Sequence, residues 1–151
     1  MTELKMGDRA PDFSLLDEKG NKVRLNDFIG KKKVVLYFYP MDFTPRCTTE
    51  ACSFRDSYKI FESTGAVVLG VGLGTVESHA KFSQKYNLPF RLLSDSTKET
   101  ARSYGVLGIG SLMAKRVTFI ISKDGKIAHV FPNVDIITHV GQIIKTLEEM
   151  K

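Results

Sequence analysis

Several features are absent from this sequence, and each absence excludes a class of protein. The longest apolar run, Val34–Tyr39, is far shorter than the roughly 20 residues that a membrane-spanning helix needs. The N-terminal residues Met1–Met6 lack the basic-then-apolar pattern of a signal peptide. We therefore expect a cytoplasmic protein with no membrane contact.

Charge of one sign is not concentrated anywhere in the chain. The 22 Lys and Arg residues outnumber the 17 Asp and Glu residues, giving a net charge of +5. The one basic cluster, Lys31–Lys33, leads directly into a strand-like run and is explained by a solvated turn, so we expect no nucleic-acid partner. Low-complexity tracts and long linkers are also missing, and 151 residues suit a single domain spanning 1–151.

Residues for metal or nucleotide binding are sparse. His79, His129 and His139 do not stand at ligand spacing from the two cysteines, so we expect them to be surface residues or buried polar residues with satisfied hydrogen bonds. The glycine-rich stretch 70–74 follows a predicted strand, but Thr75 stands where a dinucleotide fingerprint needs its third glycine. Thr75 is better explained as a helix cap, and we expect no bound cofactor.

Hydrophobic periodicity predicts an α/β protein. The expected elements, in chain order, are a hairpin of 13–16 and 23–25, a strand over 34–39, a helix over about 45–62, a strand over 66–71, a helix over 76–86, a short segment at 90–93, a helix after the capping-box pattern Ser96-Thr97-Lys98-Glu99, strands over 116–121 and 126–131, and a final helix with the apolar stripe Ile136, Val140, Ile143 and Leu147.

This order combines a βαβ unit, a second hairpin and a closing helix. The βαβ unit implies parallel strands with a right-handed crossover, whereas the turn at Asp124-Gly125 implies an antiparallel pair. Together they predict a thioredoxin-like fold, with a mixed central sheet flanked by helices and an added N-terminal β-hairpin.

Two cysteines, Cys47 and Cys52, follow the strand at 34–39. Thr44 suits the N-cap of a helix and Pro45 its first position, which places Cys47 in the first turn. Free backbone N–H groups and the helix dipole favour an anion there, and they favour the reactive thiolate. In a reducing compartment such a pair is more often catalytic or redox-sensing than structural.

An intact helix keeps the two thiols apart. Five residues correspond to about 140° of rotation and about 7.5 Å of rise, so the Cα atoms lie roughly 8.6 Å apart. Disulfides need Cα atoms within about 7 Å. A Cys47–Cys52 bond therefore requires the first turns to unwind.

The residues alone are also compatible with different roles for the cysteines. Both could be small buried hydrophobic residues, and a Cys–His hydrolase is not excluded by spacing, although no particular histidine is indicated. The absence of a Cys-x-x-Cys motif argues against a simple thioredoxin-type reductase.

The segment Pro40-x-x-x-Thr44-x-x-Cys47 matches the signature of peroxiredoxins. Its continuation, 47–56, closely resembles the branch called bacterioferritin comigratory protein or peroxiredoxin Q. The similarity extends over nearly the whole chain, through Ala10-Pro11-Asp12-Phe13, Glu77-Ser78-His79-x-Lys81-Phe82, Leu88-Pro89-Phe90-x-Leu92-Leu93-Ser94-Asp95, Tyr104-Gly105-Val106, Arg116-Val117-Thr118-Phe119-Ile120-Ile121 and Asp124-Gly125-Lys126-Ile127.

This resemblance implies a thiol peroxidase that reduces hydrogen peroxide and organic hydroperoxides. Cys47 matches the peroxidatic cysteine, which becomes a sulfenic acid, and Cys52 matches the resolving cysteine of an intramolecular disulfide. Thr44 matches the threonine that bonds the thiolate and the peroxide, and Pro40 the proline that shields the sulfur. Arg116 matches the arginine that supports charge on the departing oxygen; the alternative for Arg116 is an exposed charge at a strand end.

The resemblance also implies partners. It suggests no bound metal, haem or flavin, and a thioredoxin-type dithiol as reductant. The chain ends directly after its last helix, which favours intramolecular resolution. We expect a monomer or weak dimer. Arg46 replaces a usual glycine, and Met41 and Phe43 make the loop more apolar, which favours organic or lipid hydroperoxides. The alternatives are a general thiol–disulfide oxidoreductase and a redox-sensing binding module on the same fold.

Overall fold

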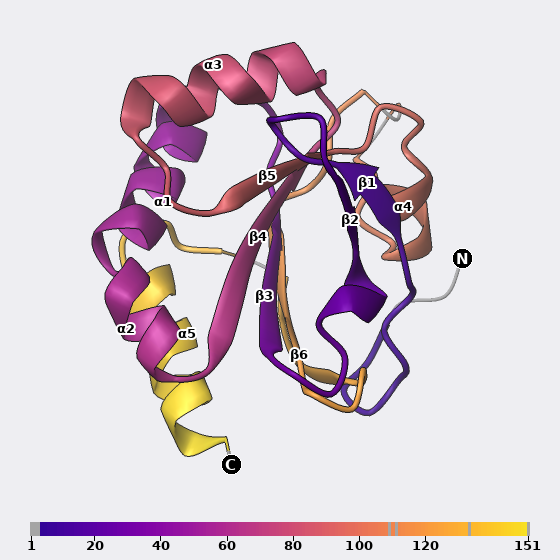
Figure 1. Cartoon of the computed structure of the whole chain (residues 1–151), viewed down its shortest axis with the longest axis vertical. Helices are drawn as coiled ribbons and strands as arrows, with labels where there is room; N and C mark the ends of the chain where they lie inside the picture. Colours follow the sequence, from indigo (N-terminus) through magenta and orange to yellow (C-terminus); the bar gives the residue numbers. More distant parts are fainter. Residues whose placement is uncertain (1–3, 109, 111, 133, 151) are drawn as a thin grey trace.

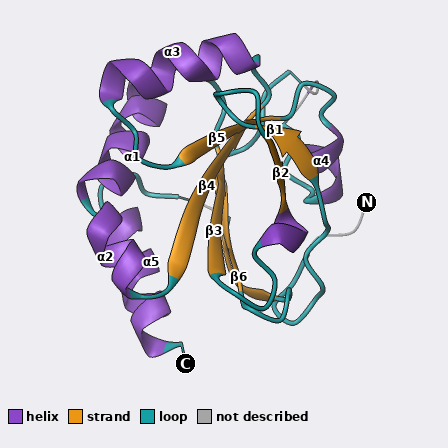
Figure 2. Cartoon of the chain, in the orientation of Figure 1, coloured by secondary structure: helices purple, strands orange, loops and turns teal. Residues whose placement is uncertain are grey.

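The computed structural model describes residues 4–108, 110, 112–132 and 134–150; the terminal residues 1–3 and 151 lie outside this description. The described strands form one seven-stranded sheet in the order β2-β1-β5-β4-β3-β6-β7 (Figures 1 and 2). The strands are β1 (Ser14–Leu16), β2 (Lys22–Arg24), β3 (Lys33–Phe38), β4 (Ala66–Gly72), β5 (Arg91–Ser94), β6 (Val117–Ile121) and β7 (Ile127–Phe131).

The sheet is mixed, as the sequence predicts. Strands β3, β4 and β5 run parallel to one another, whereas β6 and β7 and the N-terminal hairpin β1–β2 pair antiparallel. The helices are α1 (Pro45–Asp56), α2 (Tyr58–Ser63), α3 (Val76–Tyr86), α4 (Glu99–Ser103) and α5 (His139–Glu149), with a 3-10 turn at Leu25–Asp27. The expected α/β architecture with an N-terminal hairpin is confirmed.

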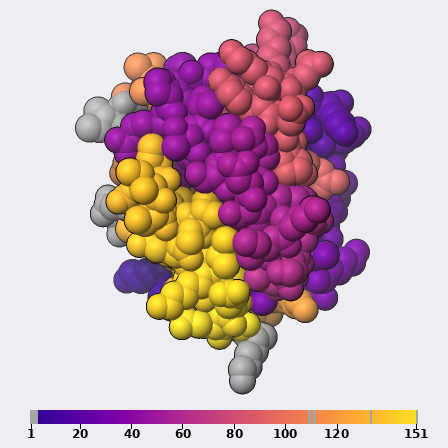
Figure 3. All heavy atoms as spheres, turned by 90° about the vertical axis from the view of Figure 1, so that its left-hand side faces the viewer, coloured from indigo at the N-terminus to yellow at the C-terminus, as the bar shows by residue number. Residues whose placement is uncertain are grey.

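Helices cover the two faces of the sheet unequally. Helices α1, α2, α3 and α5 lie on one face, and α4 lies on the other with the hairpin (Figure 1). In the space-filling view of the helical face, the surface of α5 lies against that of α1 and α2, with α3 above them (Figure 3). Strand β3 is buried throughout and alternates between the faces: Val34, Leu36 and Phe38 enter one apolar cluster, and Val35 and Tyr37 enter the other. Such two-sided burial is typical of a central parallel strand.

Two glycines of β4 make room for tyrosine rings. A Cβ atom on Gly70 would lie 2.9 Å from the ring of Tyr37, and one on Gly72 would lie 3.0 Å from the ring of Tyr39. The glycine-rich stretch at 70–74 therefore has a packing role. Thr75 caps α3 as predicted, since its side chain accepts a hydrogen bond from the backbone N–H of Ser78 at 3.1 Å.

The prediction of one helix over about 45–62 is wrong, because the helix breaks at Ser57. The backbone of Ser57 leaves helical geometry (φ −106°, ψ 12°) and separates α1 from α2. Phe54 of α1 and Phe61 of α2 nevertheless belong to the same apolar cluster, with ring centroids 5.5 Å apart. An apolar stripe that continues through the break hides it in the sequence.

Two further details differ from the expected pattern at helix starts. The Ser96–Glu99 capping box does not form; Lys98 is the N-cap in a left-handed conformation, and the carboxylate of Asp95 accepts hydrogen bonds from the N–H groups of Thr100 and Ala101. Helix α5 begins only at His139, so Ile136 lies outside its apolar stripe, which keeps Val140, Ile143 and Leu147. A buried carboxylate with two backbone donors is a stronger cap than an exposed serine.

Candidate active site

Cys47 lies in the first turn of α1, just beyond the carboxyl end of β3. Its side chain is only 1% exposed and packs in the apolar cluster under α1. The backbone of Thr44 is extended (φ −73°, ψ 149°), and Pro45 opens the helix, as predicted. This geometry leaves the first N–H groups of the helix without intrahelical partners, beside the sulfur of Cys47.

The hydroxyl of Thr44 donates to the carbonyl oxygen of Met41 at 3.0 Å. Thr44 therefore starts the helix through its backbone, and its carbonyl accepts from the N–H of Thr48 at 2.9 Å. Pro40 lies two residues beyond the end of β3 and is half-buried. The loop from Pro40 to Thr44 thus connects the central strand to the helix that carries the thiol.

Arg116 is brought to Cys47 from the neighbouring strand. It precedes β6, which pairs antiparallel with β3, and its Nη2 donates to Cys47 Sγ at 3.3 Å. Its Nη1 donates to Glu50 Oε1 at 2.6 Å. The side chain is only 13% exposed, so Arg116 is not the exposed strand-end charge of the alternative interpretation. A guanidinium that contacts both groups is held in one orientation.

Glu50 is not among the site residues predicted from the sequence, although its spacing from Cys47 indicates that it belongs to the site. It stands three residues after Cys47 on the same helix and therefore on the same face. Its side chain is 1% exposed, and burial raises its pKa to about 7 although Arg116 opposes the shift. Oε2 has no hydrogen-bond partner among the described residues. Glu50 therefore changes charge near neutral pH, directly behind the arginine that contacts the sulfur.

His139, at the start of α5, lies on the far side of Glu50. Its Nε2 lies 2.7 Å from Thr118 Oγ1 and 3.9 Å from Glu50 Oε2. Burial and the charge of Arg116 lower its pKa to about 4, so the ring is neutral at pH 7 and makes no ion pair with Glu50. Its Nδ1 is buried and has no partner in the described part of the chain. The expectation of a surface or satisfied histidine is therefore wrong for His139.

Cys52 is half-buried, five residues farther along α1, and both cysteines are free thiols. Cys47 belongs to the apolar cluster beneath the helix, whereas Cys52 does not. The intact helix α1 therefore holds the two thiols on different faces, as the sequence predicts.

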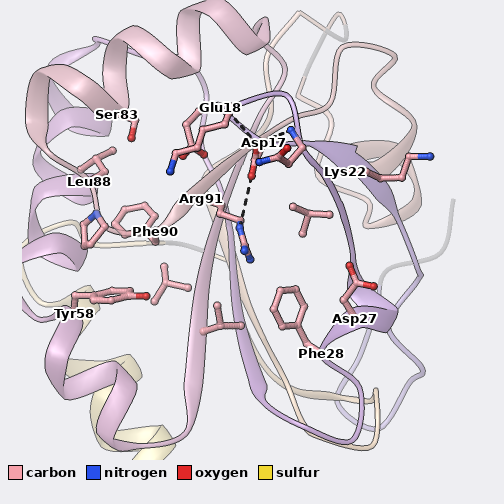
Figure 4. Close-up of a pocket in the computed structure, with 16 residues that line it drawn as sticks. Asp17, Glu18, Lys22, Asp27, Phe28, Tyr58, Ser83, Leu88, Phe90 and Arg91 are labelled. Carbon is pink, nitrogen blue, oxygen red and sulfur yellow. Dashed lines mark hydrogen bonds and ion pairs between the residues drawn. The ribbon is translucent and has the colours of Figure 1, made fainter.

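One hollow in the surface borders Arg116, and another lies away from the predicted site residues. A shallow one beside Arg116 is bounded by Arg46, Lys115 and Pro132. A larger one, of about 700 Å³, lies between the hairpin, β5 and the end of α3 and contains none of the predicted site residues. In Figure 4 the carboxylate of Asp17 points toward Arg91 across this hollow, and the two side chains lie 3.6 Å apart. Asp17 also accepts from the N–H groups of Lys19 and Asn21, which gives it a structural role in the hairpin turn.

Potential metal ligands are dispersed over the described structure. Within residues 4–108, 110, 112–132 and 134–150, no three His, Cys, Asp or Glu side chains gather as a metal site. None of the helices described is both long and apolar enough to cross a bilayer.

The chain is similar to known proteins over most of its length. Residues 6–130 match the model of the AhpC/TSA family. The chain is 40% identical to "Peroxiredoxin Bcp" of Bacillus subtilis, covering 97% of each chain, and 40% identical to "Peroxiredoxin Bcp" of Escherichia coli K12, covering 99% of each. Among solved structures, peroxidoxin BcpB of Mycobacterium tuberculosis matches with a TM-score of 0.92 at 35% identity, covering 99% of each chain. The bacterioferritin comigratory protein of Xanthomonas campestris matches with a TM-score of 0.87 at 30% identity, covering 96% of each.

Proposed function

Because this chain belongs to the AhpC/TSA family and is a thiol peroxidase, we propose that Cys47 is the sulfur that reacts with the hydroperoxide. The observation that carries this assignment is the contact between Arg116 Nη2 and Cys47 Sγ, 3.3 Å, at the buried start of α1. A guanidinium and free helix N–H groups both stabilise a thiolate, and the same groups face a bound peroxide.

The first step is an attack of the Cys47 thiolate on the terminal oxygen of ROOH. An S–O bond forms as the O–O bond breaks, and the departing RO⁻ takes a proton to leave as alcohol, or as water when R is hydrogen. Cys47 is oxidised to the sulfenic acid. Arg116 stabilises the charge that develops on the departing oxygen. Pro40 and Thr44 lie on the loop that borders this site.

The second step joins Cys47 to Cys52. The Cys52 thiolate attacks the sulfenic sulfur, water leaves after protonation, and a disulfide forms. Because the intact helix separates the two residues by more than a disulfide allows, the first turns of α1 unwind before this step. An external dithiol of the thioredoxin type then reduces the disulfide. This intramolecular route needs no second copy of the chain, which supports a monomer or weak dimer, and a supply of reduced dithiol favours the cytoplasm.

Organic hydroperoxides are proposed substrates beside hydrogen peroxide. Met41 and Phe43, on the loop that leads to Cys47, are 52% and 43% exposed. They offer an apolar border for an alkyl group at the site. The neighbour from Xanthomonas campestris is described by its alkyl peroxide reduction activity, which supports the same substrate class here.

Turnover with a thioredoxin system tests the proposed function. We expect steady consumption of hydrogen peroxide and of cumene hydroperoxide, and little reduction of insulin disulfides. The Cys52→Ser variant should react once with peroxide and then stop cycling with thioredoxin. Fast insulin reduction with negligible peroxide turnover would instead establish a general thiol–disulfide oxidoreductase.

A further inference from the structure

A second buried cluster lies beside the loop from Pro40 to Thr44, which is called the site loop below. Asp42, in the loop between β3 and α1, accepts hydrogen bonds from Tyr39 Oη at 2.6 Å and from Ser78 Oγ at 2.7 Å. Its Oδ2 also lies 2.6 Å from Nδ1 of His79, on α3. The side chains of Asp42 and His79 are only 2% and 1% exposed. The thiol chemistry described above does not use any of these groups directly.

Both ring nitrogens of His79 face oxygen atoms. Nδ1 faces the Asp42 carboxylate, and Nε2 faces the carbonyl oxygen of Leu93 at 3.1 Å. The ring is therefore held between two hydrogen-bonding oxygens on different elements. Burial alone would raise the pKa of Asp42, but the hydrogen bond and the charge of His79 outweigh it and hold that pKa below its ordinary value. The Asp42–His79 pair is therefore a short contact between two buried side chains.

This pair fastens the site loop to two distant elements. His79 belongs to α3, and Leu93 belongs to β5, so the loop is tied to the helix and sheet beside it. The next residue, Phe43, has a left-handed backbone (φ +69°), which is unfavourable for a bulky side chain. Its ring packs edge-on against Phe82, also on α3, with centroids 5.1 Å apart. These contacts on α3 hold the strained backbone immediately before the helix that must unwind.

We propose that the Asp42–His79 pair positions the site loop for reaction with peroxide, and that the pair is made in the folded form of the site and lost when α1 unwinds to bring Cys47 to Cys52. This inference rests on the proposed function. The pair stabilises the folded form of the site, in which Arg116 contacts the sulfur, relative to the unwound form, in which Cys52 reaches it. Its loss should therefore slow the first step and speed the second, because a shift between two states acts on both.

Rapid-quench oxidation with intact-mass detection separates the two steps. One added oxygen marks the sulfenic acid, and the loss of two hydrogens marks the disulfide. In His79→Gln and Asp42→Asn, we expect the rate of disulfide formation to rise about tenfold, the scale of one charge-assisted hydrogen bond, and the oxidation rate to fall by a smaller factor, set by the loss of the folded population. The double variant should match either single variant, since the pair acts as a unit. Over-oxidation by excess peroxide should decrease.

Tyr104→Phe is the matched control for lost stability. It removes one hydrogen bond, from Tyr104 Oη to the carbonyl of Pro11 at 2.6 Å, on the opposite face of the sheet, and it leaves the site loop untouched. Opposite changes in the two rates, seen in the pair variants and not in Tyr104→Phe, would support the proposal. Unchanged rates in the pair variants would overturn it. So would a fall in both rates, which is the effect expected of lost stability alone. If wild-type protein forms no disulfide at all, the proposed function itself fails.

Discussion

Replacing Cys47 by serine is expected to reduce peroxide turnover by at least about a thousandfold, because the hydroxyl is not ionised near neutral pH and does not attack the O–O bond. Serine is close to cysteine in size, and Cys47 is 1% exposed in an apolar cluster that includes Ala51 and Phe54, so the fold should survive. A coupled assay that follows peroxide-dependent NADPH consumption through thioredoxin reductase and thioredoxin measures the loss, and circular dichroism checks folding.

The matched control is Cys52→Ser on the same helix. It leaves the contact between Arg116 and Cys47 in place, so one equivalent of peroxide should still be consumed at the wild-type rate. A Cys47→Ser protein that keeps cycling would show that another group reacts with peroxide, and the assignment of the site would be wrong.

Arg116→Gln is expected to lower kcat/KM for hydrogen peroxide about a hundredfold, comparable to the loss of one preorganised donor at a transition state. The Arg116 guanidinium contacts the sulfur of Cys47 directly, through Nη2 at 3.3 Å. Removing the guanidinium should not leave Glu50 as a buried anion. Arg116 is the main group that opposes the raised pKa of Glu50, so that pKa rises further without it. Glu50 then stays protonated at neutral pH. Steady-state kinetics at pH 7 make the comparison, and a kcat/KM within twofold of wild type would contradict the role of Arg116.

Glu50→Gln is the matched control for Arg116→Gln, because it changes the other member of the Arg116–Glu50 contact. The stability of this variant should depend on pH differently from that of the wild-type protein. The pKa of Glu50 is raised from 4.5 to about 7 in the fold, so folding favours the protonated carboxyl. That contribution is complete below pH 4.5 and is lost as the pH rises through about 7. Wild-type protein should therefore lose about 3 kcal/mol of this contribution over the range, whereas the glutamine variant should not. Urea unfolding at pH 5 and pH 8 compares the two.

Local features of the site were predictable from the sequence, whereas contacts across the chain were not. Thr44 and Pro45 specify a helix start through their own backbone preferences, which places Cys47 without tertiary information. Arg116 reaches the sulfur only because β6 pairs with β3; in the sequence, only the resemblance to peroxiredoxins indicates it. Asp42 and His79 are 37 residues apart, and no local preference pairs them.

The errors in the predicted fold have related causes. The stripe that includes Phe54 and Phe61 satisfies helical spacing on both sides of Ser57, so periodicity does not register the break between α1 and α2. At α4, the pattern Ser96–Glu99 resembles a capping box, but Asp95 is fully buried and accepts two backbone hydrogen bonds. Burial, which decided between the two caps, is not visible in a short sequence motif.

The intact mass of the reduced protein after one equivalent of hydrogen peroxide, followed by peptide mapping, tests the central claim most directly. The account predicts a rapid loss of two hydrogens, mapped to a bond between Cys47 and Cys52, together with a decrease in helical circular dichroism as α1 unwinds. A protein that keeps both thiols free on the timescale of ordinary cysteine oxidation would contradict it, since Cys47 would then not be the activated thiol of a peroxidase.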